Sequence, residues 1–306
     1  MIRDAYDRPV TRVRISLTPA CNASCFYCHR EGYQNPGPLM RPEEIERIVS
    51  VMKRFGVSRV KLTGGEPTLR RDLTEIVSRL AGLGLDDLSM VTNGLLLEGL
   101  SRGLREAGLD RINVSLPSLR PERFRAITGV SGLEKVLAGI REASEVGFRQ
   151  LKVNRVILRG VNDDETDELI DFAGAVGPVV QLIQLEAPSP NDELVLKYGL
   201  SFEEMRSLLG PDAELISVRE DMHMRPIYRV RGVLVEIVGP MGNADFCFHC
   251  TRIRITYDGK FKPCLFTNEG VVDFLTPMRR GASDEELARI FLEAVSMRRP
   301  YFGLVV

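Results

Sequence analysis

Short runs of hydrophobic, largely β-branched residues alternate with longer amphipathic stretches in the first two thirds of the chain. Each run is short enough for a parallel strand whose two faces are both covered. These runs lie at residues 13–17, 57–63, 88–92, 112–116, 151–158 and 179–185. The helical patterns between them include residues 43–54, 72–80, 133–146 and 164–175. Several begin at a Ser, Thr or Asp and end at a Gly, as helices commonly do.

Six such strand–helix units predict an α/β fold. Because crossovers between parallel strands are right-handed, the helices fall on one side of a curved sheet, and the loops after the strands share one face. A closed barrel of this type needs eight strands. We therefore expect a partial (βα)6 TIM-type barrel with a lateral opening.

The alternating pattern ends near residue 188. A polar connection, a helix at 202–209, strand-like segments at 228–238 and 252–262, and a helix at 283–297 follow. Tyr257-Asp258-Gly259 within the second of these segments is typical of a hairpin turn. The expected organisation is a barrel domain at residues 1–200 and a C-terminal region at 201–306 that covers the open side.

Composition narrows the choice of partners. The 306 residues include 41 Lys or Arg and 42 Asp or Glu, so no overall field favours nucleic acid or an anionic membrane. No apolar run reaches the roughly 20 residues that span a bilayer, and the polar N-terminus does not resemble a signal peptide. The six cysteines fit a reducing compartment. We expect a cytoplasmic protein without nucleic-acid or membrane partners.

Three cysteines near the N-terminus, Cys21, Cys25 and Cys28, leave gaps of three and two residues. Three thiolates on one loop can bind three irons of a [4Fe–4S] cluster and leave the fourth iron free for chemistry. The spacing leaves two alternatives open. A zinc loop more often has CxxC pairs separated by a longer insert, and a disulfide would leave one thiol over.

A second set, Cys247, Cys250 and Cys264, has a CxxC followed by thirteen residues and a third cysteine. It suits either another iron–sulfur cluster with an open iron or a zinc site that His249 completes. Between these cysteines, Arg252 and Arg254 are two residues apart. On a strand they would face the same side, where two guanidinium groups can bind one phosphate, although surface strands also carry Arg for solubility.

Basic residues also interrupt the hydrophobic strands. Charged side chains at such positions are costly unless they are paired or face a polar cavity. They indicate an anionic ligand, with an ion pair to a strand neighbour as the alternative for each one. The residues are Arg14, Arg59, Lys61 and Lys152.

The first cysteine motif, with Tyr27 before its last cysteine, resembles the signature of the radical S-adenosylmethionine (SAM) enzymes. The resemblance implies a [4Fe–4S] cluster that binds SAM and reduces it to a 5′-deoxyadenosyl radical, which takes hydrogen from substrate. Residues 63–67, TGGEP, resemble the family's GGEP motif, whose backbone and carboxylate receive the methionine ammonium group. The SAM-binding residues implied in this way are Tyr27, Gly64, Gly65, Glu66 and Ser115.

Residues 246–266, FCFHCTRIRITYDGKFKPCLF, resemble the C-terminal motif of the GTP 3′,8-cyclase family, which begins molybdopterin biosynthesis. The resemblance implies a second [4Fe–4S] cluster whose free iron contacts guanine, and a radical formed at ribose C3′ that attacks C8. The GTP-binding residues implied are Arg14, Arg59, Lys61, Thr92, Lys152, Arg252 and Arg254. No catalytic residue beyond the cluster ligands is assigned.

The same resemblance implies an electron donor and transfer of the product to a downstream cyclic pyranopterin monophosphate synthase, and it is compatible with a homodimer. Two other classes remain as alternatives: a peptide- or protein-modifying radical enzyme with an auxiliary cluster, and a non-catalytic electron-transfer or zinc-stabilised binding protein. A three-plus-three cysteine set and a large barrel favour the enzyme.

The chain departs from the family pattern at three places. The usual SLD after the fourth strand is Ser115-Leu116-Pro117, which lacks the carboxylate and one backbone donor. Gln181 and Glu186 stand where the family has an Arg and a Met. The chain ends in Gly303-Leu304-Val305-Val306 instead of Gly-Gly, and β-branched residues cannot adopt the conformations open to glycine.

Overall fold

All six predicted strands form, in a computed structural model that describes residues 1–32, 37–187, 189 and 191–302. They pair in parallel and in sequential order, which confirms the barrel-type α/β fold. The strands are β1 (Arg12–Ser16), β2 (Arg59–Thr63), β3 (Asp87–Thr92), β4 (Arg111–Ser115), β5 (Gln150–Ile157) and β6 (Val179–Gln184).

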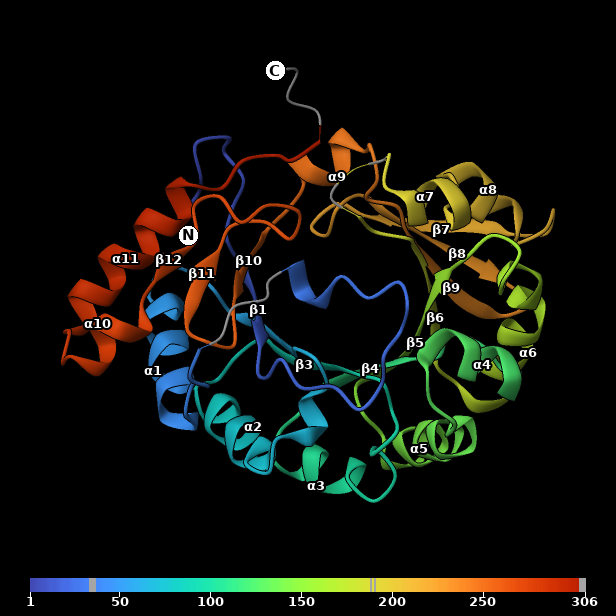
Figure 1. Cartoon of the computed structure of the whole chain (residues 1–306), viewed down its shortest axis with the longest axis horizontal. Helices are drawn as coiled ribbons and strands as arrows, with labels where there is room; N and C mark the ends of the chain where they lie inside the picture. Colours follow the sequence, from blue (N-terminus) through green and yellow to red (C-terminus); the bar gives the residue numbers. More distant parts are fainter. Residues whose placement is uncertain (33–36, 188, 190, 303–306) are drawn as a thin grey trace.

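Helices cover the outer face of this curved sheet (Figure 1). They are α1 (Pro42–Lys53), α2 (Leu73–Gly82), α3 (Ser101–Glu106), α4 (Pro121–Thr128), α5 (Leu133–Val146) and α6 (Thr166–Val176). The predicted glycine ends are confirmed for α5 and α6, where Gly147 and Gly177 adopt φ of 77° and 98°. These left-handed conformations favour glycine. The short helices α3 and α4 were not predicted.

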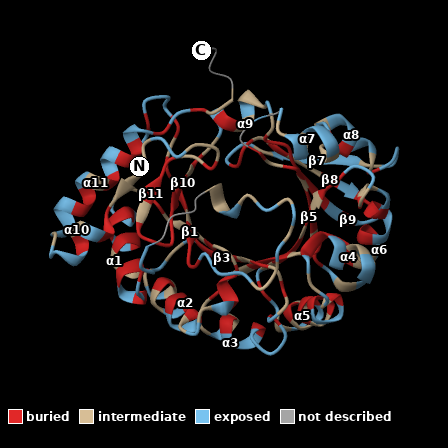
Figure 2. Ribbon diagram, viewed as in Figure 1, coloured by how far each residue is buried: buried red, intermediate tan, exposed pale blue. Residues whose placement is uncertain are grey.

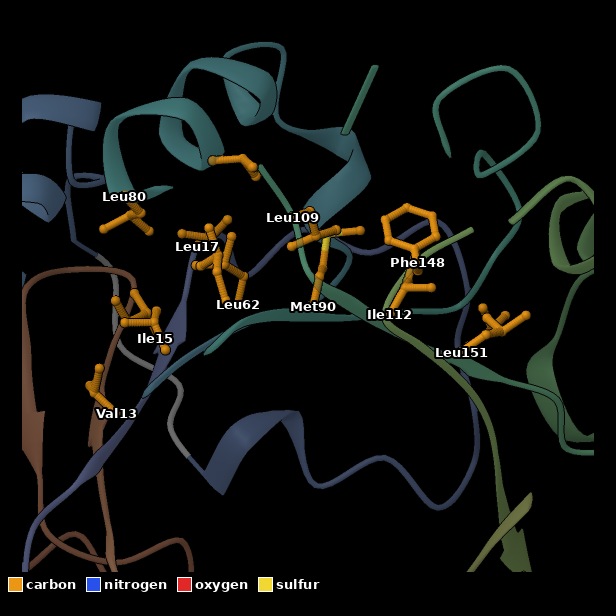
Figure 3. Close-up of a cluster of buried hydrophobic side chains, with 14 of the residues drawn as sticks. Val13, Ile15, Leu17, Leu62, Leu80, Met90, Leu109, Ile112, Phe148 and Leu151 are labelled. Atoms are coloured by element: carbon orange, nitrogen blue, oxygen red, sulfur yellow. The ribbon is translucent and has the colours of Figure 1, made fainter. Parts of the chain in front are cut away.

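Alternate residues of the strands point to opposite faces of the sheet, and the two faces differ in character. On β1, Val13 and Ile15 are buried in the hydrophobic core between sheet and helices, together with Leu62, Met90 and Ile112 of the next strands (Figure 3). The helices are buried on the side that meets the sheet and exposed on the other (Figure 2). The intervening strand positions carry the polar and basic side chains, so the inside of the barrel is polar.

The C-terminal region extends the sheet at both edges. Beyond β6 lie β9 (Val233–Val238), β8 (Arg225–Val230) and β7 (Glu214–Arg219); beyond β1 lie β10 (Arg252–Ile255), β11 (Lys260–Lys262) and β12 (Val272–Asp273). The sheet thus has twelve strands among the described residues. The predicted boundary at residue 200 therefore falls within one continuous sheet, and the two-part division stays a prediction.

Turn residues explain the two hairpins at these edges. The predicted turn after β10 forms, and Gly259 adopts a φ of 75°. The segment predicted at 228–238 is divided into β8 and β9 by Arg231 and Gly232, with φ of 49° and 83°. Two consecutive positive φ values are typical of a type I′ hairpin turn.

The remaining helices are short, apart from the last. They are α7 (Glu193–Tyr198), α8 (Phe202–Ser207), α9 (Ala244–Phe248), α10 (Leu275–Arg279) and α11 (Asp284–Ser296), and α11 confirms the predicted C-terminal helix. Figure 1 shows α9 between the two ends of the curved sheet. Within the described ranges, no helix combines the length and apolar character needed to cross a bilayer. The atypical tail, residues 303–306, lies outside the described residues.

Candidate functional site

One cavity of about 350 Å³ occupies the polar inside of the barrel. Residues from both cysteine sets line it, as do Glu66 of the GGEP turn and the basic residues of several strands. Its volume lies within the usual range for small-molecule sites. The structure therefore brings together side chains that are as far apart in the sequence as Cys21 and Cys264.

The first cysteine set lies on the loop that follows β1. Cys21, Cys25 and Cys28 are all free thiols, and the backbone N–H of Cys28 donates to the carbonyl of Cys25 at 3.0 Å. Burial raises the pKa of Cys25 to about 12, and the negative charges of Cys28 and Cys21 add to this shift. Three thiolates that repel one another in this way are stabilised by a bound cation, so the donor set fits an iron–sulfur cluster.

The GGEP turn is packed directly against this cysteine loop. The backbone N–H of Gly65 donates to the carbonyl of Thr18 at 2.7 Å, and that of Glu66 donates to Ala20 at 2.8 Å. A Cβ at Gly65 would lie 2.1 Å from the Ala20 carbonyl oxygen. The glycine is therefore required by the close approach of the loop that leads to Cys21.

We expect Gly65→Ala to lose the first cluster, because the added Cβ must push the cysteine loop away from β2. Iron in reconstituted protein should fall from about eight to about four per chain. Gly82→Ala is the matched control, since its Cβ would meet nothing within 4 Å. Iron content equal to that of Gly82→Ala would contradict this role of Gly65.

Glu66 is held by donors from two neighbouring strands. Its Oε1 accepts from the hydroxyl groups of Thr68 and Thr92, both at 2.6 Å, and its Oε2 accepts from the backbone N–H of Asn93 at 2.7 Å. Asn93 also donates through its side chain to Asn22 at 2.7 Å, beside Cys21. Oε2 keeps capacity to accept from an ammonium group. Thr92, whose contact with GTP stays a prediction, lines the cavity and donates to the predicted SAM-binding carboxylate.

Tyr27 and Ser115, the other predicted SAM-binding residues, also line the cavity. The Tyr27 ring packs against a small hydrophobic cluster of Ile127, Leu158 and Leu185. Burial raises the pKa of its hydroxyl, and the neighbouring Cys25 and Cys28 raise it further.

Two buried arginines that were not predicted from the sequence donate hydrogen bonds to the backbone of the second cysteine set. Arg8 donates to the carbonyl of Cys247 at 2.9 Å, and Arg298 donates to that of Cys250 at 2.6 Å. Asp4 pairs with both arginines, at 2.8 and 3.0 Å. Only their positions in the fold link these residues to the cysteines, so no local pattern marks them.

The charges near Cys250 favour its thiolate. Burial would raise its pKa, but Arg298 and Arg252 hold it below the usual value. His249, the alternative zinc ligand, is exposed, and its ring contacts the carbonyl of Asp245 at 2.8 Å. In the part of the chain that the structure describes, no three His, Cys, Asp or Glu side chains are grouped to hold one metal ion. A cluster does not need that grouping, because each thiolate binds a different iron.

Two arginines predicted to bind GTP meet a carboxylate that was not predicted. Glu31 pairs with Arg14 at 2.9 Å and with Arg254, and it accepts from the hydroxyl of Thr63 at 3.0 Å. Burial would raise the pKa of Glu31, yet the two arginines lower it to about 2. Glu31 has a φ of 57°, a left-handed conformation that is costly for a residue with a Cβ.

Arg252, by contrast, has no ion-pair partner among residues 1–32, 37–187, 189 and 191–302. Burial lowers its pKa to about 9, and the positive charges of Arg254 and Arg225 contribute. Lys61 is similar: burial lowers its pKa, and Arg111 and Arg14 add to the shift. Its ammonium group donates to the side chain of Asn113 at 3.3 Å and has no ion-pair partner in the part of the chain that the structure describes. The cavity therefore holds more positive charge than its own carboxylates balance.

The other two predicted basic residues lie in ion pairs. Arg59 is paired with Asp221 at 3.1 Å, and Asp221 also pairs with Arg12. Lys152 is paired with Glu236 of β9, which is fully buried. Both residues therefore form the ion pairs that the sequence left open as an alternative.

Family models match both halves of the chain. "Radical SAM superfamily" covers residues 15–173, and "Molybdenum Cofactor Synthesis C" covers residues 179–304. The probable GTP 3′,8-cyclase of Thermococcus kodakarensis is 47% identical over 99% of this chain and 100% of its own length. That of Pyrococcus abyssi is 45% identical, with the same coverage. The chain belongs to the GTP 3′,8-cyclase family of the radical SAM superfamily.

Solved structures show the same fold at low sequence identity. SuiB of Streptococcus suis, bound to its precursor peptide SuiA, has a TM-score of 0.65 and 15% identity over 96% of this chain and 66% of that one. The enzyme anSMEcpe with bound AdoMet has a TM-score of 0.64 and 15% identity over 95% of this chain and 81% of that one. These likenesses concern the fold alone.

The structure also places the residues at which this cyclase departs from the family pattern. Gln181 of β6 donates to Glu236 at 2.9 Å, on the cavity wall. The Glu186 carboxylate lies 3.8 Å from Nε2 of His29, the residue that directly follows Cys28. Pro117 accepts a hydrogen bond from Asn162 at 2.9 Å through its carbonyl, so this loop is tied to the segment before α6 without the usual carboxylate.

Proposed function

We propose that this protein cyclises GTP to (8S)-3′,8-cyclo-7,8-dihydroguanosine 5′-triphosphate, the first step of molybdopterin biosynthesis. The observation that carries the proposal is that both cysteine sets and an excess of basic side chains line one cavity. A radical source, a second cluster and a triphosphate site must meet in one space for this reaction. The sequence match to named cyclases over the whole chain supports the same conclusion.

The SAM half of the site would be built on β1 to β4. When bound, the first cluster and SAM supply a 5′-deoxyadenosyl radical. The chain's contribution is position: Gly64, Gly65 and Glu66 would receive the methionine ammonium group, and Thr92 and Asn93 fix the Glu66 carboxylate by hydrogen bonds. Tyr27 and Ser115 would complete this half.

The GTP half would lie toward β10 and the second cysteine set. Arg252 and Arg254 face the same side of β10, next to Arg14 of β1. Guanidinium groups in this arrangement can bind a phosphate through two parallel hydrogen bonds. Arg59, Lys61 and Lys152 add positive charge along the strands. Because Glu31 pairs with Arg14 and Arg254, GTP would compete with this carboxylate for the two arginines.

Glu31→Gln should therefore bind GTP more tightly, by roughly threefold to tenfold, since the amide no longer competes for the two arginines. The dissociation constant can be measured by anaerobic calorimetry on reconstituted protein. Glu75→Gln, which removes a carboxylate from a surface ion pair with Arg79, is the control and should not change it. Weaker GTP binding by Glu31→Gln would show that Glu31 supports the substrate and does not compete with it.

The proposal is tested by incubating reduced, reconstituted protein with SAM and GTP without oxygen and analysing the products by mass spectrometry. The cyclic triphosphate and 5′-deoxyadenosine should appear in equal amounts. Unchanged GTP alongside 5′-deoxyadenosine would keep the radical chemistry and exclude this substrate.

Several finer predictions belong to the same proposal. An external electron donor would reduce the first cluster, and the product would pass to cyclic pyranopterin monophosphate synthase. A cytoplasmic location fits the thiol chemistry of both cysteine sets, because a reducing compartment keeps thiols free for metal. The homodimer stays a prediction that sedimentation of the purified protein can test.

A further inference from the structure

A buried charge cluster that the sequence did not reveal forms the cavity wall opposite β10. Its centre is Glu236 of β9, whose carboxylate is completely buried. Lys152, Arg225 and Arg219 surround it, the two arginines at 3.5 and 3.4 Å. Burial would raise the pKa of Glu236, but these three cations lower it to about 2.

The cluster carries more positive than negative charge. One carboxylate, Glu236, pairs with the three cations, and a second, Glu186, acts on Arg225 at longer range. Gln181 of β6, which also contacts Glu236, is neutral. Lys152, Arg219 and Arg225 all line the cavity. An excess of buried positive charge is costly unless an anion enters the space that these side chains face.

Arg225 differs from the other members of the cluster in having a buried donor without a partner among the described residues. Only 8% of the residue is exposed. Its Nη1 meets Glu236 and its Nη2 contacts Nδ1 of His223 at 3.2 Å, but its buried Nε has no hydrogen-bond partner among the described residues. The His223 ring is in turn stacked on Phe246, with ring centres 4.0 Å apart. Arg225 is thus held in place while its Nε donor is unused.

Arg225 also acts on the residues assigned to GTP. Its positive charge contributes to lowering the pKa of Arg252 and of Arg14, after burial and nearer charges. These side chains therefore share one electrostatic environment across the cavity. A triphosphate has several negative oxygens, so it can bind arginines from two walls at once.

We propose that Arg225 is a substrate-binding residue that donates a hydrogen bond to a phosphate oxygen of the nucleoside triphosphate. Glu236 positions Arg225 and Lys152 for this contact, and His223 fixes the guanidinium plane. The inference rests on the proposed function, because it takes GTP as the substrate. It adds a phosphate contact from β8 that the strand pattern did not indicate.

The test compares dissociation constants for GTP, guanosine and SAM in wild-type protein and in Arg225→Ala, by anaerobic calorimetry. Loss of a charge-assisted hydrogen bond should weaken GTP binding on the order of 10- to 100-fold, with guanosine and SAM nearly unchanged. Arg229→Ala is the matched control on the same strand. That side chain is half exposed and pairs with Glu214, so GTP affinity should stay at the wild-type value.

Equal weakening of GTP and guanosine, or GTP binding at the wild-type level, would overturn the phosphate contact. If Arg225→Ala does not fold, the same three dissociation constants are compared in Arg225→Lys. Lysine keeps the charge beside Glu236 but loses the planar guanidinium group. Failure of the proposed function would look different: the wild-type protein itself would not bind GTP.

Discussion

Replacing Cys25 with alanine is expected to abolish the cleavage of SAM, with a loss of at least about 10³-fold in 5′-deoxyadenosine formation. Cys25 lies between Cys21 and Cys28 on the loop that the GGEP turn holds against β2. Two remaining thiolates leave a second iron without a protein ligand, so the site cannot keep a stable cluster that binds SAM. The product is measured by chromatography after reduction of the reconstituted protein.

The second cysteine set is the control for this result. It is separate in sequence and has its own support from Arg8 and Arg298. Cys25→Ala should therefore keep about four irons per chain and bind GTP as the wild type does. SAM cleavage at the wild-type rate would show that Cys25 is not a cluster ligand.

Replacing Cys264 with alanine should leave SAM cleavage in place and abolish formation of the cyclic triphosphate. The first cluster remains, so SAM is still cleaved in an uncoupled reaction, while formation of the cyclic triphosphate falls below about 1% of the wild-type rate. That loss corresponds to about 2.7 kcal/mol or more of transition-state stabilisation. The proposed reason is that Cys264, which follows β11, would hold the second cluster, and this cluster would place the guanine beside Arg252 and Arg254.

Both products are quantified in the same reaction. The ratio of 5′-deoxyadenosine to cyclic triphosphate therefore shows whether SAM cleavage depends on the first cysteine set and cyclisation on the second. It should be near one for the wild type and rise sharply in Cys264→Ala. Equal loss of both products would contradict the separate roles of the two cysteine sets.

Local sequence patterns were sufficient for the barrel strands, and they are also the basis on which the six cysteines are predicted to be cluster ligands. Hydrophobic periodicity marks a buried strand such as β1 within a few residues, and a glycine such as Gly177 marks the end of a helix. The cysteine spacings are likewise local, because each set lies mostly on one loop. The hairpin at Gly259 follows from its turn residues.

The walls of the cavity depend on pairings between distant parts of the chain. Glu31 meets Arg254, more than 200 residues later, and Lys152 meets Glu236 on a strand that joins the sheet out of sequence order. No spacing in the sequence marks such pairs. The strand β7 was not predicted either: its hydrophobic residues Leu215, Ile216 and Val218 do not alternate with polar ones, and five of its six residues are exposed. The basic residues were therefore recognised, while the carboxylates that hold them were missed.

The most direct test of the central claim uses GTP that carries deuterium at ribose C3′. Reduced, reconstituted protein is incubated without oxygen with this substrate and unlabelled SAM, and the 5′-deoxyadenosine is weighed by mass spectrometry. Transfer of one deuterium into 5′-deoxyadenosine is the predicted result, because the radical formed from SAM takes that hydrogen. Unlabelled 5′-deoxyadenosine would contradict the assignment of GTP C3′ as the point of attack.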